Sequence, residues 1–105
     1  MRVRVENVTN LNAFEIRVEF SPDSAIVVLA ANVIDSTNGG FLDPGYYFVN
    51  DLNNDEGYFH IAFTQLSGIG KTGSGDLIEI RFRALEPGVD VNFTFDTNIT
   101  KLSLL

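Results

Sequence analysis

The sequence contains no cysteine and no tryptophan, and its one histidine is His60. The missing cysteines exclude disulfides, thiolate metal sites and cysteine nucleophiles together. His60 has no second histidine or cysteine with which to hold a metal, and no nucleophile-elbow motif accompanies it. No apolar run approaches the roughly 18 residues that a membrane-spanning helix needs. We therefore expect a protein that is not an enzyme and does not enter a membrane.

Basic residues are also few. Lys and Arg together number 7 against 14 Asp and Glu, which gives a formal net charge of −7 at pH 7. An acidic domain repels phosphate backbones, so nucleic acid is not the expected partner. The length of 105 residues suits one domain over residues 1–105, and the hydrophobic fraction of 45% is enough to form its core.

Alternation of apolar and polar residues is the main structural signal. Over Leu11 to Phe20, large apolar residues alternate with small or charged ones, which is typical of a strand with one buried face. Turn residues follow each such stretch, including a Gly-rich loop expected over Ser67 to Gly75. Further strands are predicted at Arg2 to Val8, Tyr46 to Asn50, Gly57 to Thr64, Asp76 to Leu85, Val91 to Phe95 and Lys101 to Leu105. Ala25 to Val33 is instead a nearly continuous apolar run, whose β-branched residues favour a buried strand, with a partly helical segment as the alternative.

No segment shows a convincing helical period. Seven to eight short strands separated by regular turns predict an all-β protein, a two-sheet antiparallel β-sandwich. The polar face of the Leu11 to Phe20 strand must then meet either water or a partner, and this choice is the functional question.

Two short motifs suggest ligand binding. Asp51, Asn53 and Asp55 have the spacing of the oxygen ligands that open a calcium loop. Glu56 stands where that loop needs glycine, and Ala62 stands where it needs a bidentate glutamate. A solvated hairpin turn is therefore the favoured reading, and calcium at these residues is the weaker alternative.

The second motif is Gly70 to Thr72, which is similar to the end of a phosphate-binding loop. Gln65 occupies the position of the first required glycine, and a strand rather than a helix follows. Without a helix N-terminus to hold the phosphates, the segment is predicted to be a flexible inter-strand loop.

Glu15 and Glu19 are two positions apart on one strand face, with Arg17 between them. Paired carboxylates catalyse glycoside hydrolysis only when they flank a cleft. On a flat sheet, a solvated ladder or a binding surface is the favoured interpretation. His60 is predicted on the outward face of its own strand, as a surface residue or an interface residue.

The sequence as a whole resembles a cohesin domain, the module that receives dockerin domains in cellulosomes. The resemblance begins over residues 5–23 and continues through residues 57–67, residues 73–84 and the turn at Pro87 and Gly88. Ser21 replaces the Asp that the family usually has in its aromatic-Asp-Pro turn.

The resemblance implies a jelly-roll fold and a non-catalytic module that binds a dockerin-type domain, in an extracellular or cell-surface assembly that degrades polysaccharides. It implies no cofactor for this chain, because calcium is carried by the dockerin. Carried over by position, the implied partner-binding residues are Ala13, Glu15, Arg17, Asp51, Asn53, His60, Ala62, Gln65 and Leu102.

Compared with the family pattern, we expect this chain to lack the first strand and to have a last strand that is shortened or absent. Those two strands lie together on one sheet in the family, so their loss would leave the strand at Arg2 to Val8 as an open edge. An open edge exposes unpaired N–H and C=O groups and favours pairing with another copy. We therefore expect a homo-oligomer through this edge, a dimer or larger, or else a fragment trimmed on purpose.

Two other functions remain open at this stage. A carbohydrate-binding module of similar jelly-roll fold would need exposed aromatic rings, and the candidates are Tyr58 and either Tyr46 or Tyr47. The other alternative is a structural or adhesion domain that spaces its neighbours and binds no partner.

Overall fold

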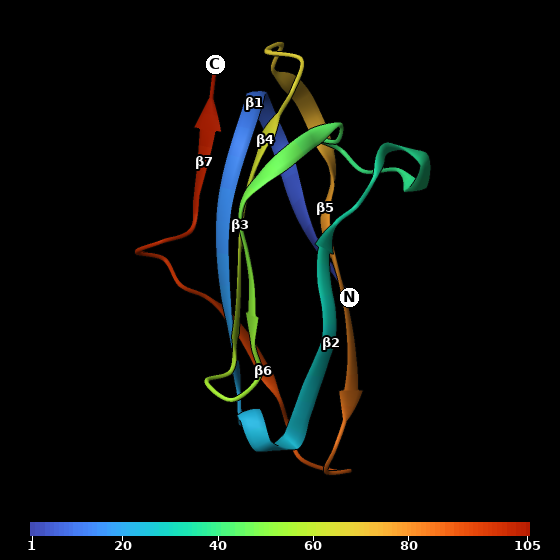
Figure 1. The fold of residues 1–105 in the computed structure, drawn as a ribbon, viewed down its shortest axis with the longest axis vertical. Coiled ribbons are helices and arrows are strands. Elements are labelled where there is room, and N and C mark those ends of the chain that lie inside the picture. Colours follow the sequence, from blue (N-terminus) through green and yellow to red (C-terminus); the bar gives the residue numbers. More distant parts are fainter.

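The computed structural model describes all residues 1–105, and it consists of strands with two single-turn 3₁₀ helices (Figure 1). This confirms the predicted all-β sandwich of antiparallel strands. The 3₁₀ helices are Asp23–Ala25 and Ser36–Asn38. The strands are β1 (Arg2–Ser21), β2 (Ile26–Val33), β3 (Gly45–Asn53), β4 (Tyr58–Gln65), β5 (Lys71–Ala84), β6 (Asn92–Phe95) and β7 (Lys101–Leu104).

β1 is a single strand of 20 residues, so the prediction of separate strands at Arg2 to Val8 and Leu11 to Phe20 was wrong. Asn7, near the end of the first stretch, and Asn10, between the two stretches, have φ angles of 51° and 56°. Asparagine tolerates this left-handed region better than most residues do. The strand bends there without ending, and its two halves enter opposite layers of the sandwich.

Each layer is therefore built on one half of β1. In the first layer, the N-terminal half of β1 pairs with β5, and β5 pairs with β2. In the second layer, the C-terminal half of β1 pairs with β4, and β4 pairs with β3. The other edge of this half pairs with β7 and then with β6. Figure 1 shows β7 and the C-terminal half of β1 on one side of the molecule, and β2, β5 and the N-terminus on the other.

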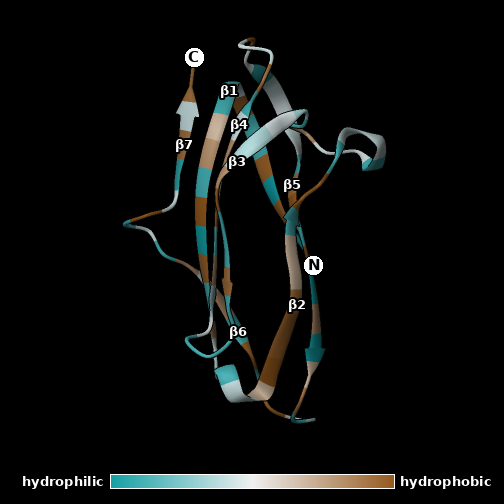
Figure 2. Ribbon diagram, viewed as in Figure 1, coloured by the Kyte–Doolittle hydropathy of each residue, from teal (hydrophilic) through white to brown (hydrophobic).

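The core lies between the layers and follows the alternation seen in the sequence. Phe14, Ile16, Val18 and Phe20 of β1 are all buried, as predicted, and they pack with the inward residues of β4 and β5. Figure 2 shows the alternating hydropathy of β1 as bands along the ribbon. No polar or charged residue is buried in this core, so its cohesion comes from apolar burial.

The Gly-rich segment differs from the prediction. The loop expected over Ser67 to Gly75 ends at Gly70, and β5 begins at Lys71. The hydroxyls of Thr72 and Ser74 accept hydrogen bonds from the backbone N–H groups of Asn10 and Asn7, at 3.1 Å and 2.9 Å. These side chains satisfy the donors that the bend in β1 leaves out of the regular ladder, so the segment is ordered as a strand.

The apolar run at Ala25 to Val33 was predicted to be a buried strand, but β2 is only partly buried, because it lies at the edge of its layer. A register shift between Val28 and Ala30 turns Leu29 outward, where it is 53% exposed. Edge strand β3 of the other layer lies across from β2, and the Tyr47 hydroxyl accepts the Val33 N–H at 2.8 Å. Side chains thus close this side of the sandwich.

Candidate functional site

The outer surface of the second layer carries most of the residues that the resemblance implicated. We call this surface the His60 face. It comprises the outward side chains of the C-terminal half of β1 and of β3, β4 and β7. These residues are Ala13, Glu15, Arg17, Glu19, Tyr46, Val49, Asp51, Asn53, Tyr58, His60, Ala62, Thr64, Lys101 and Ser103.

Strand register arranges these side chains in rows across the strands. One row runs from Val49 through Ala62 and Glu15 to Lys101. The next begins at Asp51 and continues through His60 to Arg17. Directly opposed residues on antiparallel strands point to the same face, so each row is a set of neighbours. The side chains near Ala62 are consequently small and apolar, and charged side chains lie beside them.

Glu15 is the centre of a polar cluster on this face. Its carboxylate oxygen Oε2 lies 2.7 Å from His60 Nε2, and its Oε1 lies 3.6 Å from Lys101 Nζ. The hydrogen bond with His60, and then the charges of His60 and Lys101, hold the pKa of the Glu15 carboxyl below its ordinary value of 4.5. Glu15 is therefore ionised at neutral pH, and its oxygens are already oriented.

A second cluster surrounds Tyr58. The Arg17 guanidinium carbon lies 3.8 Å from the centroid of the Tyr58 ring, as a cation–π contact requires. The Tyr58 hydroxyl donates to Asp51 Oδ2 at 2.9 Å, and this bond raises the pKa of Tyr58. Glu19 and Asp96 lie 3.7 Å and 3.9 Å from Arg17 Nε, so the charge of Arg17 is balanced although Nε has no hydrogen-bond partner.

The structure brings together seven of the nine residues named from the resemblance, which are Ala13, Glu15, Arg17, Asp51, Asn53, His60 and Ala62. It does not bring Leu102 to them, because Leu102 pairs with the inward residue Phe14 and shares its face. Gln65 lies two positions after the inward residue Phe63 on β4, so it belongs to the inward side of the strand and not to the His60 face. Its Oε1 atom is buried without a hydrogen-bond partner.

Sequence reasoning missed one aromatic residue beside this face. A register shift between Tyr47 and Val49 makes Phe48 a bulge residue, and its side chain is 69% exposed. Its ring meets the Tyr46 ring at a centroid distance of 5.1 Å and an interplanar angle of 63°. The available signal was the run of apolar residues from Tyr46 to Val49, which does not alternate as a regular strand would.

Two oxygens of the candidate calcium motif accept hydrogen bonds from the protein itself. Asp51 Oδ2 accepts from the Tyr58 hydroxyl, and Asn53 Oδ1 accepts from the Glu56 N–H at 2.9 Å. No group of three or more His, Cys, Asp or Glu residues is placed to hold a metal ion. These two hydrogen bonds link the turn between β3 and β4 to itself and to the neighbouring strand.

Comparison with known families identifies the architecture. The family model of the cohesin domain matches residues 1–103. The chain belongs to the cohesin family. The match covers both layers of the sandwich, so the whole structure, and not one motif, carries the relationship. No curated protein and no solved structure gives a significant match.

Cohesin domains are non-catalytic interaction modules that bind dockerin domains, typically within extracellular or cell-surface scaffold proteins. The chain is thus a protein-interaction domain by family. Among its 3₁₀ and strand elements there is no helix that is long and apolar enough to span a bilayer.

Proposed function

We propose that the His60 face is the surface on which this cohesin domain receives a dockerin-type domain, and that the complex attaches polysaccharide-degrading enzymes to an extracellular or cell-surface scaffold. The observation that carries the proposal is the arrangement of seven implicated residues on one flat sheet face whose opposite side is core. A face without backbone edges leaves recognition to side chains, which is how specificity is set in an interface.

The face has the composition of a docking surface. Ala13, Val49 and Ala62 leave a shallow apolar strip against which a helix can pack closely. Glu15, with its oxygens fixed by His60 and Lys101, flanks this strip as a preorganised acceptor. Such a group pays little conformational entropy when a partner's donor reaches it.

Tyr46 and Phe48 supply the apolar anchor at one corner of the face. They are 48% and 69% exposed, although aromatic rings of this size are normally buried. Interfaces concentrate their binding energy in a few aromatic residues surrounded by polar groups. The aromatic corner at Phe48 therefore anchors the partner, and the polar cluster at Glu15 sets the partner's orientation.

The same aromatic pair bears on the carbohydrate alternative. A sugar-stacking platform needs a ring that presents its flat face to solvent, whereas the Tyr46 and Phe48 rings meet edge to face. Tyr58 is covered on one side by Arg17. These arrangements favour a protein partner over a polysaccharide surface.

The proposal is tested by calorimetric titration of the chain with a panel of dockerin domains, first in calcium and then in EDTA. Binding in calcium to at least one dockerin is expected, with loss of binding in EDTA because the partner carries the calcium. Glu15→Gln and His60→Ala should each weaken this binding about tenfold or more, as interface hydrogen bonds to charged groups do.

Glu86→Gln is the matched control, because Glu86 is exposed and makes none of the ion pairs of the His60 face. It should leave binding unchanged. Circular dichroism of each variant checks that the sandwich is folded. Equal binding by wild type, Glu15→Gln and His60→Ala would place the dockerin surface elsewhere, and binding to insoluble cellulose alone would support the carbohydrate-binding alternative.

A further inference from the structure

Arg17 is the one arginine of β1 whose guanidinium makes no hydrogen bond within the chain. Its backbone N–H and C=O are bonded to the Thr100 hydroxyl, but its side-chain Nε is buried without a hydrogen-bond partner. The carboxylates of Glu19 and Asp96 lie 3.7 Å and 3.9 Å from Nε, beyond the length of a hydrogen bond. A guanidinium has five N–H donors, so the donor capacity of Arg17 is unused.

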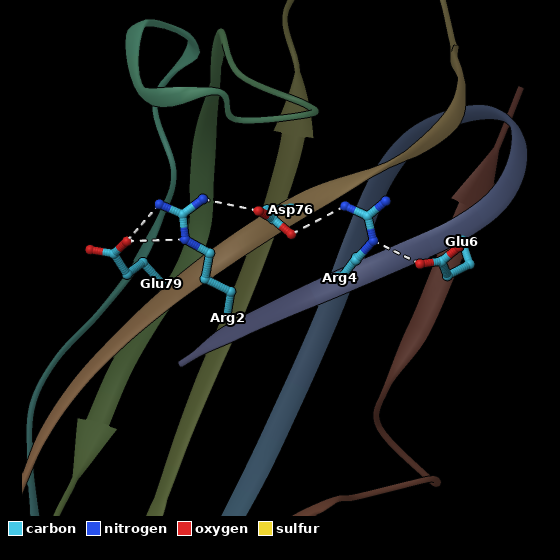
Figure 3. Close-up of polar contacts among 5 residues, drawn as sticks. All are labelled: Arg2, Arg4, Glu6, Asp76 and Glu79. Atoms are coloured by element: carbon cyan, nitrogen blue, oxygen red, sulfur yellow. Dashed lines mark hydrogen bonds and ion pairs between the residues drawn. The ribbon is translucent and has the colours of Figure 1, made fainter.

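The other two arginines of β1 show how the chain completes a guanidinium. Figure 3 shows Arg2 between Glu79 and Asp76, and Arg4 between Asp76 and Glu6. Arg2 donates to Asp76 at 2.9 Å and to Glu79 at 3.0 Å, and Arg4 donates to Glu6 at 2.7 Å. Their side chains are 42% and 50% exposed, whereas that of the unbonded arginine is 24% exposed. The arginine with the least access to water is therefore the one that the chain leaves without acceptors.

The Tyr58 ring fixes the position of the Arg17 guanidinium. At 3.8 Å from the ring centroid, the guanidinium carbon lies on the face of the ring. The ring is itself held, because its hydroxyl donates to Asp51 Oδ2 at 2.9 Å. Nε is the only nitrogen of this side chain that is both buried and unbonded, so the two Nη atoms, which also lack partners, are accessible. They form a preoriented pair of donors on the His60 face.

The charge of Arg17 needs no further anion. Glu19 and Asp96 both lie beside Nε, and Asp51 lies at the hydroxyl end of the Tyr58 ring. The chain as a whole carries a formal net charge of −7. A carboxylate brought by a partner would meet these negative charges at short range. The N–H donors of Arg17, by contrast, lose their water when a partner covers them, and they then need an acceptor.

We propose that Arg17 donates to main-chain carbonyl oxygens of the dockerin, and that this uncharged contact decides which dockerins the domain accepts. The inference rests on the proposed docking at the His60 face. Main-chain carbonyls are acceptors without a full charge, and each has two lone pairs. The small side chains of Ala13 and Ala62 on the same face let the backbone of a partner come close to the sheet. A dockerin whose carbonyls are paired elsewhere leaves the donors of Arg17 covered and unsatisfied, and therefore binds more weakly.

The proposal is tested first by calorimetric titration of Arg17→Lys with a dockerin that binds the wild type. Lysine keeps the positive charge beside Glu19 and Asp96 and loses the planar fork of donors, so we expect the dissociation constant to rise about tenfold or more. Arg4→Lys is the matched control, because Arg4 lies on the same strand but in the other layer, and it should leave the dissociation constant unchanged. Urea denaturation checks that both variants are folded. A folded Arg17→Lys variant that binds as tightly as the wild type would overturn the proposal.

Double-mutant cycles distinguish a main-chain acceptor from a side-chain acceptor. Each cycle pairs Arg17→Lys with an alanine substitution of one oxygen-bearing side chain of the dockerin. Alanine leaves the main-chain carbonyls in place, so the two substitutions should change the logarithm of the dissociation constant additively in every cycle. A dockerin side chain whose removal abolishes the effect of Arg17→Lys would identify that side chain as the acceptor, which contradicts the proposal.

Substitutions of Tyr58 test whether its ring positions Arg17. Tyr58→Phe keeps the ring under the guanidinium and should keep most of the affinity, whereas Tyr58→Leu removes the ring and should raise the dissociation constant about as much as Arg17→Lys does. Equal dissociation constants for the two Tyr58 variants would contradict the proposal. Failure of the proposed function is recognised separately, because then no dockerin binds, or Glu15→Gln and His60→Ala bind as the wild type does.

Discussion

Asn54 and Val28 are joined by two hydrogen bonds that cross from one layer of the sandwich to the other. Asn54 Oδ1 accepts the Val28 N–H at 2.8 Å, and its Nδ2 donates to the Val28 C=O at 3.0 Å. Asn54 lies in the turn between β3 and β4, while Val28 lies where β2 loses its regular register with β5. One side chain thus replaces the backbone partner that β2 lacks at its irregularity.

Asn54→Ala should therefore lower the free energy of unfolding by about 1–3 kcal/mol, because it leaves a half-buried N–H and C=O unpaired. Urea denaturation followed by circular dichroism measures the change. Asn32→Ala is the control, since Asn32 is exposed on the same strand and should change stability by no more than about 0.5 kcal/mol. Equal effects for the two variants would mean that the Asn54 bonds do not stabilise the fold.

Tyr47→Phe removes one hydroxyl from the same closed side of the sandwich. The Val33 N–H loses its acceptor, while the ring keeps its edge-on contact with Phe63 at 5.3 Å. We expect a loss of about 0.5–1.5 kcal/mol in unfolding free energy. Tyr46→Phe is a matched control, because Tyr46 is exposed on the opposite face of the strand and should leave stability unchanged.

The pH dependence of stability should report the Glu15 cluster. The folded state holds the pKa of Glu15 below its ordinary value of 4.5, so its carboxylate stabilises the fold above that value. The contribution is lost as the pH falls through the lowered pKa, because the protonated group no longer favours the folded state. The difference in unfolding free energy between wild type and Glu15→Gln should accordingly shrink on acidification from pH 6, whereas a constant difference would contradict the assignment.

Phe48→Ser separates partner binding from folding. Phe48 is 69% exposed, so its loss should change the unfolding free energy by no more than about 0.5 kcal/mol. If the corner at Phe48 is an anchor for the dockerin, affinity should fall about tenfold or more in calorimetric titration. Leu29→Ser, on an exposed position of the other layer, should leave affinity unchanged. A Phe48→Ser variant that binds as wild type does would remove this corner from the interface.

Sequence reasoning was most accurate where one face of a strand is buried. The outward positions on β4, including His60 and Ala62, were assigned correctly. Side chains alternate between the two faces of a strand, so burying Phe59 and Ile61 turns their neighbours outward. Sequence reasoning failed at irregularities. The bulge at Phe48 is marked in the sequence only by an apolar run that does not alternate. The asparagines at the bend of β1 predict the end of a strand, whereas β1 continues through them.

The amino-acid sequence by itself determined that the chain is an all-β sandwich and which side chains of β1 and β4 face outward, because alternating hydrophobicity specifies both strand and face. Only the tertiary structure decided that β1 belongs to both layers, that Glu15 lies against His60, and that Asn54 bonds to Val28 across the layers. These features depend on which strands become neighbours. Neighbours are chosen by packing and by backbone hydrogen bonds between segments far apart in the chain, and no local pattern of residues records that choice.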